Sequence, residues 1–184
     1  DRKGVMLEMK PFGIGRSRLI FEAPTRGLIG YQSELLTVTS GTAVINRLFS
    51  RYESYKGEIK GRTNGVLISN GNGISVAFAL FNLEERGQMI IGSGIPVYQG
   101  MIIGVHTRPN DLEVNILKGK KLTNIRTHSK DEAVKLTPPL AMNLEKAIAW
   151  ISDDELIEVT PKSIRIRKKF LDPNVRKKIA RKVS

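Results

Sequence analysis

Residues 153–169 read DDELIEVTPKSIRIRKK, and this stretch decides how the second half of the chain is expected to fold. On either side of Thr160-Pro161 lie the mostly apolar segment Leu156–Val159 and the segment Ser163–Lys169, along which apolar and polar side chains alternate. Such alternation is typical of half-buried strands, and a Thr-Pro pair between them favours a turn. We therefore expect two paired strands. In the second strand, alternation places on one face Arg165, Arg167 and Lys169, and mainly on the other Ile164, Ile166 and Phe170.

The charge of this second strand belongs to a basic excess at the C-terminal end. Residues 160–184 contain ten Lys or Arg residues against one acid, a net +9 out of the chain's formal +12. Residues on one face of a strand lie about 6.6 Å apart, a spacing that suits a row of phosphate groups. A solvated face that merely keeps a strand edge soluble is the alternative, but acids would then be interspersed. The pattern favours contact with nucleic acid.

A second basic cluster, residues 118–130, carries five Lys or Arg residues and no acid. It has no clear apolar period, so we expect a long exposed loop, a kind of segment that is often functional. Because it lacks aromatic residues for stacking, it favours contact with the backbone of RNA or another polyanion. An ordinary mobile loop is the alternative. The candidate RNA-binding residues of the whole chain are Lys118, Lys120, Lys121, Arg126, Lys130, Arg165, Arg167, Lys168, Lys169, Arg176 and Lys177.

The N-terminal part of the chain indicates the order β-β-α-β. Val5–Lys10 and Arg16–Ala23 flank a run of turn-forming residues, which predicts a hairpin. Thr25 is expected to cap a helix whose apolar face runs over residues 28–36, and Thr42–Arg51 is expected to form another strand. This order is the back portion of a split βαβ, or ferredoxin-like, domain. Its first strand and helix would precede Asp1.

A loss of apolar periodicity at residues 56–64 indicates a linker between a first domain, residues 1–55, and a second, residues 65–184. In the second domain, Val66–Ser69 and Ile74–Phe81 flank an Asn-Gly-Asn-Gly run, which is a strong hairpin pattern.

Further elements are expected in this second domain. They are strands at Val97–Thr107 and Leu112–Leu117, a short helix that starts at Asn143, and a last helix that starts at Asp172-Pro173. The predicted fold class is therefore α+β, with a partial ferredoxin-like domain followed by a mainly β domain with short helices.

Motifs for catalysis are missing from the sequence. The chain has no cysteine, no phosphate-binding G-x-x-x-x-G-K-[ST] loop and no G-x-S-x-G motif. His106 ends an apolar segment, which indicates a structural or surface role. The acidic run of residues 153–155 is best interpreted as a solvated turn, because no ligand-spaced oxygen pattern accompanies it. We expect no catalytic residue, no metal site and no cofactor in this chain.

Membrane association is not expected either. Residues 88–105 carry no charge, but glycine and proline interrupt them every few residues, unlike a spanning helix. The last helix has an apolar face too thin for an amphipathic membrane anchor. The chain begins with Asp1 and no charged-then-apolar leader follows, so we expect a fragment without a signal peptide.

Several stretches resemble known families. PTRGLIGYQSE (24–34), TSGT (39–42) and FSRY (49–52) resemble the last common domain of the translational GTPases, which is related to domain V of elongation factor G. NGVLISNG (64–71), LKGKKLTN (117–124) and residues 153–169 resemble the C-terminal domain particular to the BipA/TypA family. Together these stretches extend over almost the whole chain.

This resemblance implies a bacterial or organellar GTPase that binds the 70S ribosome and takes part in translation regulation, stress responses, growth at low temperature and assembly of the large subunit. It implies that the C-terminal domain binds the ribosome, with residues 118–130 reaching toward the acceptor end of A-site tRNA. The domain that binds GTP and Mg²⁺ in such a parent protein matches no residue here.

We therefore expect a fragment that docks on rRNA and tRNA without catalysis, in the bacterial cytoplasm or in an organelle. The alternative is a protein-interaction or structural module whose positive charge only aids solubility, and binding to bare rRNA would distinguish the two. The oligomeric state stays open, because the incomplete first domain could be completed by swapping with a neighbouring copy.

Overall fold

The computed structural model describes residues 2–59, 61–119 and 135–183. The chain divides into two compact units, residues 1–61 with 148–150 and residues 62–147 with 151–184. Helices and strands occur in both, which confirms the α+β class. None of the helices in these described ranges is long and apolar enough to cross a membrane.

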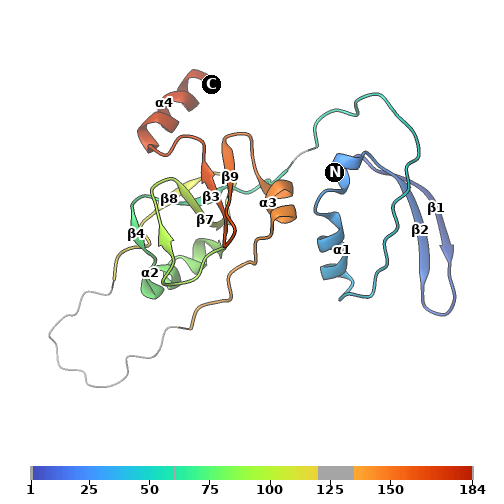
Figure 1. Cartoon of the computed structure of the whole chain (residues 1–184), viewed down its shortest axis with the longest axis horizontal. Coiled ribbons are helices and arrows are strands. Elements are labelled where there is room, and N and C mark those ends of the chain that lie inside the picture. The colour runs from blue at the N-terminus through green and yellow to red at the C-terminus, as the bar shows by residue number, and fades with distance from the viewer. Residues whose placement is uncertain (1, 60, 120–134, 184) are drawn as a thin grey trace. The chain divides into compact units, whose positions relative to one another are not determined.

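The first unit begins with an antiparallel hairpin of β1 (Val5–Pro11) and β2 (Ser17–Glu22), as expected (Figure 1). In the turn, the backbone N–H of Phe12 donates to the carbonyl oxygen of Arg16 at 2.9 Å. A bulge interrupts the register between Met6 and Glu8.

The helix of this unit starts later than expected. Residues 25–28 form the 3₁₀ turn η1 (Thr25–Leu28), and Thr25 caps nothing. The helix α1 (Tyr31–Val38) begins after Gly30, whose φ of 72° is left-handed. Glycine adopts this conformation at little cost, so the chain can turn between η1 and α1 there.

The strand expected at Thr42–Arg51 is not formed, and residues 42–59 lie in no helix or strand. A segment becomes a strand only when a neighbouring edge accepts its backbone hydrogen bonds. Among the described residues, β1 and β2 pair only with each other. Residues 42–59 are held instead by side chains, such as Arg51, whose Nη2 lies 2.9 Å from Glu22 Oε2.

The second unit is built on a six-stranded sheet in the order β8-β3-β7-β10-β9, with β5 paired to β7. All neighbours are antiparallel except β3 and β8. The strands are β3 (Val66–Ser69), β5 (Gly87–Met89), β7 (Met101–His106), β8 (Leu112–Val114), β9 (Glu155–Val159) and β10 (Ile164–Lys168).

The hairpin expected around residues 70–73 does not occur. Both edges of β3 are occupied, by β7 and by β8, so the following segment cannot pair with it. The short strand β4 (Gly73–Ile74) pairs instead with β6 (Pro96–Val97). The rest of the expected strand is the helix α2 (Ala77–Phe81), which is followed by the 3₁₀ turn η2 (Glu84–Arg86).

The two further strands are shorter than expected. Val97–Thr107 is interrupted between β6 and β7, where Gly100 has a φ of +83°. The second, expected at Leu112–Leu117, ends at Val114.

The two remaining helices begin where the sequence indicates. In α3 (Leu144–Trp150), Asn143 Oδ1 accepts the backbone N–H of Lys146 at 2.8 Å. The helix α4 (Pro173–Val183) follows β10 at the C-terminal end (Figure 1).

The hydrophobic core lies in the second unit and joins α2 to the sheet. Its buried members come from five strands, from α2 and from the segments beside them. They are Leu67, Leu80, Leu83, Met89, Val97, Met101, Ile103, Val114 and Ile116.

Candidate RNA interface

The hairpin β9–β10 carries the basic strand that the sequence singled out, and its pairing confirms that prediction. Its turn is closed by the backbone N–H of Thr160, which donates to the Ser163 carbonyl oxygen at 2.9 Å. In this register Arg165 lies opposite Glu158. The pairing therefore places one carboxylate beside the basic row.

Glu158 holds the arginines of β10 in place. Its Oε1 accepts from Arg167 Nε at 2.8 Å, and its Oε2 accepts from the Tyr98 hydroxyl at 2.6 Å. Arg165 Nε lies 3.6 Å from the same Oε2. This nitrogen is buried and has no hydrogen-bond partner within the described part of the chain. One carboxylate thus organises two guanidinium groups and one phenol.

Tyr98 stays protonated in this cluster. Burial raises the pKa of its phenol, and the hydrogen bond to the negative carboxylate of Glu158 raises it further. The hydroxyl is therefore a stable donor that keeps the Glu158 carboxylate oriented toward Arg167.

The two arginines keep part of their surface in solvent. The side chains of Arg165 and Arg167 are 35% and 25% exposed, and together they exceed the charge of Glu158 by one. Such partly exposed ion pairs contribute little to stability. Guanidinium groups suit phosphate oxygens because they donate several N–H bonds in a fixed plane. The arrangement is able to bind a phosphate.

Lys168 is placed differently, and its prediction as a residue available to RNA needs correction. Its side chain is only 2% exposed, because it shares the inner face of β10 with Ile164 and Ile166. The ammonium group contacts carboxylates of Asp111 at 2.6 Å, Asp154 at 2.7 Å and Glu155 at 3.0 Å. It is therefore occupied inside the protein.

The pKa of Lys168 reflects this environment. Burial on its own would lower the pKa, but the hydrogen bonds to Asp111 and Asp154 and the charge of Glu155 outweigh burial and raise it. Lys168 is therefore charged at neutral pH.

The acidic run at residues 153–155 is a solvated turn only in part. Asp153 and Asp154 are exposed, but the side chain of Glu155 is fully buried. Its carboxylate accepts from Arg62 Nη2 at 2.8 Å and from the backbone N–H of Ser152 at 3.1 Å. The interpretation of the whole run as solvated was wrong for Glu155. Its buried carboxylate pairs with Arg62 and Lys168, which are distant in the sequence.

Two more of the candidate RNA-binding residues, Arg176 and Lys177, lie in the first turns of α4. Asp172 Oδ1 accepts the backbone N–H of Asn174 at 2.8 Å, which confirms the expected cap. Arg176 is mostly buried, donates to the Leu171 carbonyl oxygen at 2.7 Å and pairs with Glu113 of β8. Its guanidinium therefore anchors α4, whereas Lys177 is exposed.

The other candidates divide between exposed residues and residues that the structure does not describe. Lys118 and Lys169 are exposed. Lys120, Lys121, Arg126 and Lys130 lie outside the described residues.

The described ranges contain no group of three or more His, Asp or Glu residues able to hold a metal ion. His106 is buried, and its Nδ1 lies 2.5 Å from the Asn110 carbonyl oxygen, as expected of a structural residue.

The sequence patterns did not single out Tyr98 and Glu158 as members of the basic cluster. Glu158 could have been found, because counting outward from the turn of the predicted hairpin pairs it with Arg165. Tyr98 lies 60 positions before Glu158 in the chain, and no local pattern connects the two.

Comparison with known proteins shows which families the two parts of the chain resemble. A family model described as the TypA/BipA C-terminal domain matches residues 64–173, and one described as the elongation factor G C-terminus matches residues 1–63.

Three relatives carry the name large ribosomal subunit assembly factor BipA. The protein from Salmonella typhimurium is 55% identical over 182 residues, that from Haemophilus influenzae 54% over 181, and that from Buchnera aphidicola 50% over 182. Each match covers 98% of this chain but only 29–30% of the relative, so the chain spans less than a third of their length.

Proposed function

The chain belongs to the TypA/BipA family, and from this premise we propose that it is the RNA-binding end of a longer ribosome-associated GTPase. Its partners would be the 70S ribosome, through rRNA and the acceptor end of A-site tRNA, in the bacterial cytoplasm. The parent protein would serve assembly of the large subunit, translation regulation and the response to stress or cold. GTP hydrolysis with Mg²⁺ would belong to parts of the parent outside this chain.

The observation that carries this proposal is the exposed positive charge near the C-terminal end. Lys169 and Lys177 are exposed, and Arg165 and Arg167 are partly exposed. Residues 160–184 offer a single acid, Asp172, to offset them. Lys and Arg side chains that neutralise phosphates release condensed counterions, which supports binding to any RNA backbone.

Charge reversal tests the proposal. Replacing Lys169→Glu and Lys177→Glu together should weaken binding of the chain to a 23S rRNA fragment. The slope of log affinity against log salt should fall in magnitude by about 1.4 to 1.8, because each lost phosphate contact contributes about 0.7 to 0.9. Fluorescence anisotropy at several salt concentrations measures both quantities.

The matched control is Arg16→Glu with Arg18→Glu, which changes the net charge equally at two exposed residues of the first unit. This variant should keep the wild-type slope. An equal loss in both double variants would show that only net charge matters, and an unchanged slope in the Lys169 and Lys177 variant would contradict the proposal.

A separate part of the proposal concerns residues 118–130, which we propose to contact tRNA. Lys120→Glu with Lys121→Glu should weaken binding of an acceptor-stem RNA more than binding of the 23S fragment. Equal effects on the two RNAs would remove the assignment of this cluster to tRNA.

A further inference from the structure

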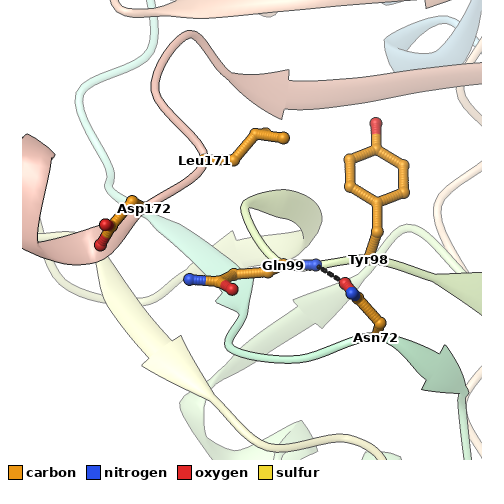
Figure 2. A pocket seen from close by; sticks show the side chains of 5 residues that line it. All are labelled: Asn72, Tyr98, Gln99, Leu171 and Asp172. Atoms are coloured by element: carbon orange, nitrogen blue, oxygen red, sulfur yellow. Dashed lines mark hydrogen bonds between the residues drawn. The ribbon is translucent and has the colours of Figure 1, made fainter.

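A pocket of about 460 Å³ opens in the second unit, beside the basic hairpin. In Figure 2 the amide of Gln99 extends to the same side as the carboxylate of Asp172, while the ring of Tyr98 lies at the opposite side. The lining residues are Asn72, Tyr98, Gln99, Leu171 and Asp172.

The walls of this pocket are held by the backbone. Asn72 Oδ1 accepts the backbone N–H of Gln99 at 2.8 Å, and the N–H of Gly100 donates to the Ser69 carbonyl oxygen at 2.9 Å. A Cβ on Gly100 would lie 2.8 Å from Leu171 Cα, so the two segments approach closely only because residue 100 is glycine. The backbone at Gln99 and Gly100 is therefore held in place beside Asn72 and Leu171, which reduces the entropy lost when a ligand binds on this side.

We propose that this pocket binds one unpaired guanine base of an RNA strand, and this inference rests on the RNA-binding function proposed above. Tyr98 and Leu171 supply one aromatic and one aliphatic surface, which suit a flat base. Proteins recognise single-stranded RNA by stacking splayed bases on aromatic side chains and bonding to their edges.

Asp172 selects for guanine among the four bases. An ionised carboxylate only accepts hydrogen bonds, and it accepts two parallel ones well. Guanine alone presents two adjacent donors on its Watson–Crick edge, N1–H and the N2 amino group. Asp172 Oδ1 accepts one bond from Asn174, which leaves Oδ2 and further lone pairs for such a ligand.

The amides complete the recognition. Asn72 uses its oxygen on Gln99, so its NH₂ group is the part left to donate to a ligand. The side-chain amide of Gln99 both donates and accepts. Donors of this kind fit the O6 and N7 acceptors of guanine.

Charge places the base, and not a phosphate, inside the pocket. The carboxylate of Asp172 would repel a phosphate there. Outside it, the Tyr98 hydroxyl binds Glu158 at 2.6 Å, and Glu158 binds Arg167 at 2.8 Å. A strand whose guanine enters the pocket thus has a cation two hydrogen bonds away from Tyr98 for its phosphates.

The test compares the affinities of the chain for fluorescently labelled RNA hexamers that differ in one base. The full chain should bind UUGUUU at least about fivefold more tightly than UUUUUU, UUAUUU or UUCUUU, which is the low end expected of one bidentate base contact. Anisotropy at a fixed salt concentration gives the four affinities.

Two variants locate this preference. Gln99→Ala and Asp172→Asn should each remove most of the preference for UUGUUU and leave the affinity for UUUUUU within about twofold. Asp172→Asn keeps the helix cap, because Asn caps as well as Asp. The matched control is Gln88→Ala, at an exposed glutamine of β5, which should keep the preference.

Each outcome decides between the possibilities. Equal binding of all four hexamers, or a guanine preference that survives both variants, overturns this inference even if the rRNA fragment binds with the expected salt dependence. If the wild-type chain binds neither the hexamers nor the rRNA fragment, the proposed function is overturned as well. Displacement of UUGUUU by micromolar guanosine monophosphate would assign the pocket to a free nucleotide instead of RNA.

Discussion

Arg167 and Lys168 are neighbours in the sequence with opposite surroundings. The side chain of Arg167 is 25% exposed and shares one carboxylate, whereas that of Lys168 is 2% exposed and contacts three. Strand alternation separates the two side chains onto different faces of β10. Arg167 therefore keeps part of its surface in solvent, whereas Lys168 is enclosed and supports the fold.

Removing the charge of Lys168 should destabilise the second unit. Lys168→Met leaves the buried Glu155 with Arg62 but without its ammonium partner, and removing one member of a buried ion pair costs about 3 to 5 kcal/mol. Urea denaturation measures the free energy of unfolding. Lys169→Met, at the exposed neighbour, is the matched control and should stay within about 0.5 kcal/mol of the wild type.

The pH dependence of stability should reveal the same residue. The pKa of Lys168 is raised in the folded chain, and that of an unfolded lysine is about 10.4. Its contribution to the free energy of unfolding is thus fully present below about pH 10.4 and is lost as the pH rises through the folded value. The stability difference between wild type and Lys168→Met should shrink above this pH. A constant difference up to the alkaline limit of denaturation measurements would contradict the raised pKa.

At the level of elements, the start of α4 is set by two adjacent residues. Asp172 satisfies the Asn174 N–H, and Pro173 takes the first helical position. Both residues act within one turn of the helix. This explains why the start of α4 was predictable from the sequence.

Asp172→Ala should therefore loosen α4, because the loss of an N-cap costs about 0.5 to 2 kcal/mol. Hydrogen exchange of the backbone amides in residues 174–178 should speed up in this variant. Asp172→Asn retains the cap and should exchange as the wild type does. Equal exchange in the wild type and the alanine variant would show that Arg176 and Glu113 hold the helix without the cap.

The paired strands β9 and β10 were predictable for a related reason. The strand β3 was also predicted at Val66–Ser69, but its partners were not. The turn at Thr160–Ser163 is local, so the apolar segment before it and the alternating segment after it were sufficient. The partners of β3 are β7 and β8, which lie tens of residues further along the chain. Their pairing removes the free edge that a hairpin would have needed.

For the whole molecule, the two units differ in how much apolar surface they bury. The described residues of the range 1–61 include no buried apolar side chain, and Met6, Leu7 and Met9 of β1 are exposed. The second unit contains the core cluster around Leu67 and Ile103. The linker at residues 56–64 stays a prediction.

Hydrogen exchange should show this difference in the full chain. Amides of β1 and β2 should exchange at much lower opening free energies than those of β3 and β7, because buried apolar contacts set local stability. Mass spectrometry of peptides from the two regions measures both. Equal protection of the two hairpin strands and of β7 would contradict this expectation.

Local patterns of the sequence were sufficient for the β1–β2 hairpin, the β9–β10 hairpin, the starts of α3 and α4, and the concentration of positive charge at the C-terminal end. Each of these depends on neighbours within a few residues. Only the tertiary structure decided that Lys168 and Glu155 are buried together, that Tyr98 meets Glu158, and that Gln99 faces the same pocket as Asp172. Burial and ion pairing depend on which distant segments become neighbours, and long-range strand pairing determines those neighbours.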